Sequence, residues 1–202
     1  MASREKLQAA IRDTLERATP DDDFALVLQA AAVEQSRLLS DMLTDDQKAE
    51  VAEQALDIGL HSASSDAAGK AMLRDIRYTA AAALGARKWT HAASFMIEHL
   101  DMSIGEFDKG LVDRNHLLDA IGELGAMNTH EAAVRLTQYL VLLNSYTEKG
   151  KAYDDQIVFA VLTNLGVLGD KVAFDDLMYT QYLNYSAGVK KAARTALDKL
   201  KW

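Results

Sequence analysis

The residue types that could do chemistry are present in this chain, but their spacing matches no metal-site motif. Five histidines are spread along it: His61, His91, His99, His116 and His130. His91 and His99 are eight residues apart with Glu98 nearby, yet zinc needs three or four converging ligands and the spacing places no third. His130 and Glu131 begin like a zinc-protease helix, but position 134 is not the histidine that the metal needs. We therefore expect structural or solvated histidines and no metal site.

Nucleophilic and acidic side chains also favour structure over catalysis. The chain has no cysteine, which excludes disulfides, thiolate metal ligands and a cysteine nucleophile. Its serines stand in no strand–turn–helix elbow, and no Gly-Lys-Ser or Gly-Lys-Thr phosphate loop is present. Most clustered aspartates stand at predicted helix starts, where the helix dipole favours acids, but we place Asp175 and Asp176 inside a helix. We expect no catalytic residue and no cofactor.

The elements that must position any site are helices. The 202 residues include 33 alanines and a single proline, and alanine is the best helix former while proline is the strongest breaker. The net charge of −8 argues against binding to nucleic acid or acidic lipid. The uncharged, largely apolar stretch 157–169 has 13 residues, fewer than the roughly 18 that cross a bilayer. We expect a cytoplasmic all-α protein, or an exported one if a signal peptide was removed upstream of Met1.

An internal repeat organises the sequence. The pair Leu-Gly recurs with its leucine at Leu84, Leu124 and Leu165. The steps between these pairs are 40 and 41 residues. Sixteen residues after the first two pairs stand Leu100 and Leu140, whereas the matching Leu183 lies 18 residues after the third, as if a turn had gained two residues. Apolar residues recur at helical spacing in each unit, which predicts two helices joined by a tight turn.

This period predicts one repeat domain, 1–202. We expect helical pairs at 22–61, 73–102, 111–143 and 155–185, a capping helix at 187–202 and a charged helix at 3–18 that closes the other end. The predicted helix caps are Thr19 with Pro20, Thr44 with Gln47, Asn128 with Glu131, Asp170, and Ser186. Glycines near the ends of first helices predict close helix approach or left-handed caps: Gly85, Gly125 and Gly166.

Two segments resemble the first-helix signature of the armadillo/HEAT repeat family. Residues 76–85 read Ile-Arg-Tyr-Thr-Ala-Ala-Ala-Ala-Leu-Gly, and residues 189–197 repeat the pattern, with Asp198 where glycine is usual. The turn proline that the family often carries is absent. The resemblance implies a right-handed α-α superhelix, or solenoid, of about four to five hairpins with an extra terminal capping helix. It implies that second helices line a concave face, and it implies no particular chemistry.

The links between units are predicted to be longer than two antiparallel helices require. They span 61–73, 102–110 and 144–154. The alternative for the first link is that part of it extends the next helix backwards. In the third link, Tyr153 is a candidate anchor that packs back on the helices. We expect the first and third links to emerge at one end as a ridge beside the groove, and a protease to cut first near Lys149, Lys151 and Lys70.

The candidate site is the concave groove that the HEAT resemblance implies, because tyrosine and arginine are enriched on protein-binding surfaces. Its candidate residues are Glu98, His99, Arg135, Gln138, Tyr139, Asp175, Tyr179 and Tyr182. Asp175, Tyr179 and Tyr182 follow one another at helical steps, which predicts a shared helix face. The alternative places these tyrosines at the rim of the core with their hydroxyls in water.

The function that these features favour is a non-enzymatic interaction or scaffold module that binds a protein or peptide, with a monomer as the default. A second interpretation is an enzyme on a HEAT-like scaffold, of the phycobilin-lyase or DNA-glycosylase type. The acidic composition, with an isoelectric point near 5.1, argues against the glycosylase, which must track phosphates. A third is a structural fragment of a larger exported or envelope protein.

Overall fold

The computed structural model describes residues 44–151 and 153–201. The chain divides into two compact units, Met1–Arg87 and Lys88–Trp202, which we describe separately. Several predicted features lie outside the described residues: the helix at 3–18, the Thr19–Pro20 cap, residues 22–43 of the first helical pair, and Trp202. The described part is all-α and contains no strand, only an isolated bridge between Asp170 and Lys201. None of its helices is both long and apolar enough to cross a membrane.

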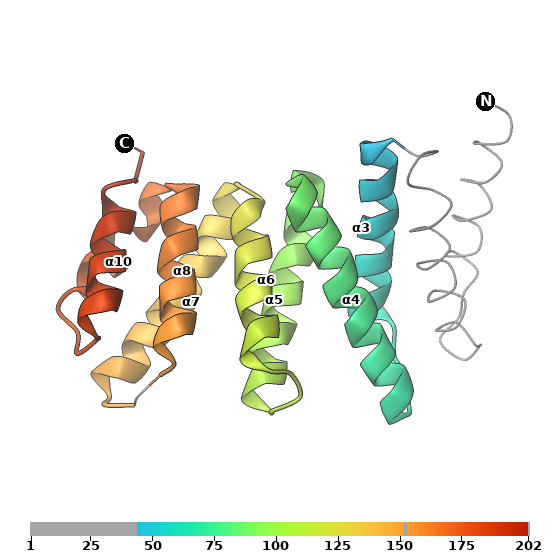
Figure 1. Ribbon diagram of the computed structural model, residues 1–202, viewed down its shortest axis with the longest axis horizontal. Helices are drawn as coiled ribbons and strands as arrows, with labels where there is room; N and C mark the ends of the chain where they lie inside the picture. The colour runs from blue at the N-terminus through green and yellow to red at the C-terminus, as the bar shows by residue number, and fades with distance from the viewer. Residues whose placement is uncertain (1–43, 152, 202) are drawn as a thin grey trace, which may run out of the picture. The chain divides into compact units, whose positions relative to one another are not determined.

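The first unit contains a helical hairpin of α3 (Asp45–His61) and α4 (Ala67–Arg87) (Figure 1). The predicted capping box is present: the Thr44 hydroxyl accepts from the Gln47 N–H, and the Gln47 side chain accepts from the Thr44 N–H. Most of the predicted link at 61–73 is the beginning of α4, as the backward-extension alternative proposed. Lys70 therefore lies in a helix, which removes the reason to expect a cut there.

The described part of the second unit, 88–151 and 153–201, holds six α-helices and two short 3₁₀ turns. The helices are α5 (Ala93–Asp108), α6 (Arg114–Ala126), α7 (His130–Glu148), α8 (Asp155–Leu168), α9 (Phe174–Thr180) and α10 (Ala187–Leu197). The 3₁₀ turns η1 (Thr90–Ala92) and η2 (Lys171–Ala173) lead into α5 and α9. In one layer α8 packs between α6 and α10, and in the other α7 packs between α5 and α9. We call α6, α8 and α10 the first layer, in front in Figure 1, and α5, α7 and α9 the second layer.

The buried positions of the second unit repeat at the spacing seen in the sequence. In the second layer Ala92, Ala132 and Ala173 are fully buried, at steps of 40 and 41 residues, and so are Met96, Leu136 and Leu177. In the first layer Leu117 and Val158, and Leu124 and Leu165, are buried pairs 41 residues apart. This register matches α7 to α9 without a gap. The predicted correspondence of Leu183 with Leu140 is therefore wrong, because α9 ends at Thr180.

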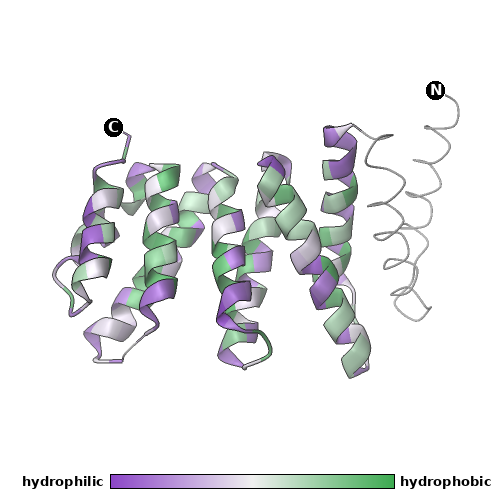
Figure 2. Cartoon of the chain, in the orientation of Figure 1, coloured by the Kyte–Doolittle hydropathy of each residue, from purple (hydrophilic) through white to green (hydrophobic). Residues whose placement is uncertain are grey.

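The first layer ends in a polar surface. On α10, Val189, Ala193 and Ala196 are buried, while Lys191 and Arg194 are exposed. Figure 2 shows α8 green along most of its length and α10 largely purple and white. The predicted capping helix stops at Leu197, and the chain then turns so that the Lys201 N–H donates to the Gly169 carbonyl at 2.8 Å.

Of the predicted helix starts in this unit, one is wrong. Asp170 and Ser186 accept from the N–H groups of Val172 and Val189, as expected. Asn128, however, has φ 53° and stands in the turn before α7, so Thr129 takes the cap instead and accepts from Ala132.

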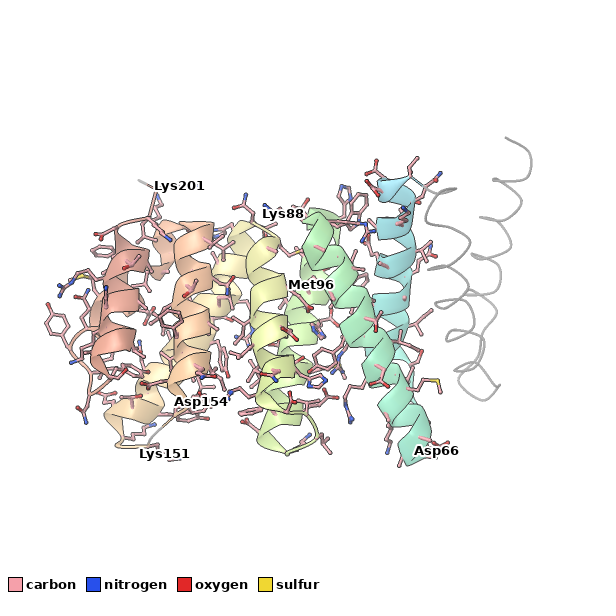
Figure 3. All side chains as sticks on the ribbon, viewed as in Figure 1. Asp66, Lys88, Met96, Lys151, Asp154 and Lys201 are labelled. Atoms are coloured by element: carbon pink, nitrogen blue, oxygen red, sulfur yellow. The ribbon has the colours of Figure 1, made fainter. Side chains whose placement is uncertain are left out.

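The links of the second unit are short, contrary to the prediction. α5 continues to Asp108 and α7 to Glu148, so the links are only 109–113 and 149–154. Gly110 and Gly150 adopt φ 68° and 73°, the left-handed conformation that ends helices, and these glycines are the signal for the later helix ends. Both links lie at one end of the unit in Figure 1, and Figure 3 labels Lys151 and Asp154 there, with Lys88 and Lys201 at the other end.

Two side-chain pairs join residues that are 40 positions apart. In the first layer an Arg114 amino group donates to Asp154 at 2.9 Å, and in the second layer His130 Nδ1 lies 2.7 Å from Asp170 Oδ2. Each aspartate is also the cap of the element that it begins. Consecutive repeats are thus tied at the same position in both layers.

Candidate protein-docking face

The centre of the site is the outward side of α7. Besides its first and last residues, the exposed residues of this helix are Glu131, Gln138, Val141 and Leu142, which follow at steps of seven, three and one. Most of the residues between them are buried, and Leu136 and Leu140 are fully so. Since residues three, four and seven apart share one side of a helix, α7 turns two polar and two apolar side chains away from the core.

The helices on either side continue this surface. Glu98 of α5, Gln138 of α7 and Tyr179 of α9 each stand two residues after the equivalent buried positions Met96, Leu136 and Leu177, and all three are exposed. Met102 and Leu142 are likewise 40 residues apart and exposed. We call this surface the α5–α7–α9 face. Its residues are Glu98, Asp101, Met102, Glu131, Gln138, Val141, Leu142, Asp175 and Tyr179.

Two polar contacts hold the three helices at this face. Arg135 Nε of α7 donates to Asp101 Oδ1 of α5 at 2.6 Å. The Tyr179 hydroxyl of α9 donates to Glu148 Oε1 of α7 at 2.8 Å, and this hydrogen bond raises the pKa of Tyr179. The bond also fixes the direction of the ring, which therefore has little rotamer freedom left to lose.

Beneath the face, a polar cluster joins α7 to α9. The Thr180 hydroxyl lies 3.2 Å from Asn144 Oδ1 and 2.8 Å from the Asp176 carbonyl, to which Asn144 Nδ2 also donates at 3.3 Å. Thr180 and Asn144 are buried. Asp175 and Asp176 lie in the first turn of α9, where the helix dipole favours them, so the prediction that this pair is interior to a helix is wrong.

Four of the eight sequence-predicted site residues are exposed side chains of the face: Glu98, Gln138, Asp175 and Tyr179. Arg135 is half-buried against Asp101. His99 and Tyr139 are buried, so the expectation that they line a surface is wrong. They stand three residues after Met96 and Leu136, and this places both on the inward side.

Both buried side chains have partners inside the unit. His99 Nε2 lies 3.3 Å from Glu123 Oε2, which connects α5 to α6. The Tyr139 hydroxyl lies 3.2 Å from that of Tyr153, and burial raises the pKa of Tyr139. Tyr153 is therefore the anchor that the sequence predicted for the third link.

Tyr182 does not share a helix face with Asp175 and Tyr179. It lies beyond α9, in the link to α10, with 77% of its surface exposed. The sequence did not point to the other five residues of the face, namely Asp101, Met102, Glu131, Val141 and Leu142. The 40-residue spacing of Met102 and Leu142 could have indicated that they occupy equivalent positions. Residue 102 was predicted to lie in a link, so this equivalence was not used.

The two layers carry very different charge. The second-layer helices contain eight acidic residues and one arginine, a net charge of −7. The first-layer helices contain three acids and four bases, a net charge of +1. Any partner that approaches the α5–α7–α9 face therefore meets a negative potential.

Within residues 44–151 and 153–201, no group of three or more histidine or acidic side chains is placed to hold a metal ion. Comparison of the chain with models of protein families, with curated proteins and with solved structures finds no match.

Proposed function

We propose that this chain is a single HEAT-like solenoid domain that binds a protein or peptide on the α5–α7–α9 face and catalyses no reaction. The repeat of buried positions every 40 to 41 residues and the two-layer arrangement of the second unit support the repeat interpretation. In a HEAT-like superhelix the second helices line the concave side, which is where this face would lie.

The observation that carries the proposal is a set of large apolar side chains exposed on one side of three helices. Met102 is 38% exposed, Val141 46%, Leu142 40% and Tyr179 40%. Single exposed apolar residues are ordinary, but several on one side of adjacent helices, with Met102 and Leu142 at equivalent repeat positions, support an interaction site. Methionine and tyrosine are among the residues enriched at such sites.

The enzymatic alternative of the glycosylase type has less support. An enzyme that tracks DNA needs cations to replace the counterions of the phosphates. The second-layer helices offer one arginine, and that arginine is held by Asp101.

A photo-crosslinking experiment tests the proposal. Benzoylphenylalanine is placed either at Gln138, on the α5–α7–α9 face, or at Thr163, an exposed position on α8 of the first layer. After irradiation in lysate of the source organism, we expect discrete adducts from position 138 and none from position 163. Adducts of equal yield at both positions, or none at 138, would contradict the proposed function.

A further inference from the structure

We propose that the occupant of the α5–α7–α9 face is a basic segment of a partner protein, with apolar anchor residues flanked by lysine or arginine. This inference rests on the proposed function and gives the partner its chemistry. It combines two properties of the face, the exposed apolar centre and the surrounding acids.

The apolar centre calls for large apolar side chains in the partner. Val141 and Leu142 stand one turn from Gln138 on α7, with Met102 at the equivalent position of α5. Covering them removes apolar area from water, and that burial is the main non-directional source of affinity. A partner segment made only of charged residues would leave this apolar area exposed to water.

The acids around this centre call for cations. Glu98 lies on α5, Glu131 on α7 and Asp175 on α9, so each helix brings an exposed carboxylate to the face. Arg135 is the one lysine or arginine of these three helices, all of whose residues the structure describes, and it pairs with Asp101. The net negative charge of these three helices therefore favours a partner segment that carries lysine or arginine.

A second copy of the chain fits less well. Each chain carries a net charge of −8, and α10 carries three basic residues. The exposed side of α10 presents Lys191, Arg194 and Thr195, with no large apolar anchor among them. Self-association through α10 would satisfy the acids and leave the apolar centre uncovered.

The test uses a synthetic peptide of about 16 residues, with leucine at helical spacing and lysine elsewhere, and a matched peptide with glutamate for lysine. Each is labelled with a dye and titrated with the intact chain at low and moderate salt, with fluorescence anisotropy as the readout. We expect the lysine peptide to bind the wild-type chain and the glutamate peptide not to bind.

Two pairs of variants locate the binding. Gln138 and Leu142 are exposed one turn apart on α7, and Phe159 and Thr163 are exposed one turn apart on α8. Gln138→Lys should weaken binding of the lysine peptide roughly threefold or more at low salt, and Leu142→Ser should weaken it roughly fivefold. Thr163→Lys makes the same change of charge in the first layer, and Phe159→Ser removes at least as much exposed apolar area there; we expect both to leave the affinity unchanged.

The outcomes separate the two proposals. Failure of the lysine peptide to bind, or equal effects of the α7 and α8 variants, would overturn the basic-segment inference. Binding of the glutamate peptide that is lost in Leu142→Ser would also overturn it, while leaving the face as a docking site. The crosslinking yield at Gln138 decides the proposed function independently of either peptide.

Discussion

The two layers of the second unit join their helices by different means. In the first layer α8 has one charged residue, and the backbone of α10 approaches so closely that a Cβ at Gly166 would lie 3.0 Å from Ala196 Cα. In the second layer the helices are joined by side chains, through Arg135 with Asp101 and Tyr179 with Glu148. Close backbone packing thus joins α8 to α10 in the first layer, whereas polar side-chain contacts at the surface join the helices of the second.

The largest expected effect comes from breaking the close packing of the first layer. Gly166→Val places branched side-chain carbons against the backbone and Cβ of Ala196, so α8 and α10 must separate. We expect the free energy of unfolding to fall by about 2–3 kcal/mol, measured by urea denaturation.

The control for this change is Gly122→Ala in the middle of α6. A Cβ at Gly122 meets nothing within 4 Å, so only the helix propensity changes. We expect a gain of up to about 1 kcal/mol. Destabilisation by both variants would show that glycine itself, rather than helix approach, matters in this layer.

In the second layer a hydroxyl deletion should have a smaller effect. Thr180→Val keeps the shape but removes the donor to Asn144 Oδ1 inside the buried cluster. We expect a loss of about 1 kcal/mol in the free energy of unfolding. Thr195 is the matched control, because it is exposed and its hydroxyl donates to the Lys191 carbonyl. An equal loss of unfolding free energy in Thr195→Val would show that burial of the hydroxyl does not cause the effect.

The smallest expected effect is on the pH dependence of stability, which should differ between the ties of the two layers. The hydrogen bond to Asp170 raises the pKa of His130 above its ordinary value of 6.5, and bonds from the Val172 N–H and from His130 lower the pKa of Asp170 below 3.8. The pair therefore contributes most between these two ordinary values. Its contribution is lost as the pH rises through the folded pKa of His130 or falls through that of Asp170.

Chemical denaturation of wild type and His130→Gln across this range measures the effect. We expect the stability difference to be largest between pH 3.8 and 6.5 and to shrink at alkaline pH. Arg114→Gln removes the equivalent tie of the first layer, where arginine keeps its charge throughout. A difference for His130→Gln that stays constant into alkaline pH would contradict this assignment.

The sequence predicted the all-α class, the repeat period and the whole of α8, because alanine content, helical spacing and the Leu-Gly pairs are local signals. It did not predict which side chains turn inward. His99 and Tyr139 are polar, yet they stand at an inward position of the repeat, where Glu123 and Tyr153 meet them. Such partners are distant in sequence and are brought together by packing alone.

The links were missed for a different reason. Polar composition suggested loops after Met102 and Asn144, but both residues continue a helix. The Ser103 hydroxyl donates to the His99 carbonyl one turn back, and Asn144 bonds across to α9, so each polar group has a partner within the fold. Composition alone does not register such partners.

Carboxylate footprinting tests most directly the claim that the second layer is the docking surface. Exposed acids of the intact chain are labelled with a carbodiimide and an amine, with and without saturating lysine–leucine peptide, and read by mass spectrometry. We expect protection of Glu98, Glu131 and Asp175 on the second layer, and unchanged labelling of Asp119 and Asp155 on the first. Protection of Asp119 and Asp155, with the second-layer acids labelled as in the chain alone, would contradict the account.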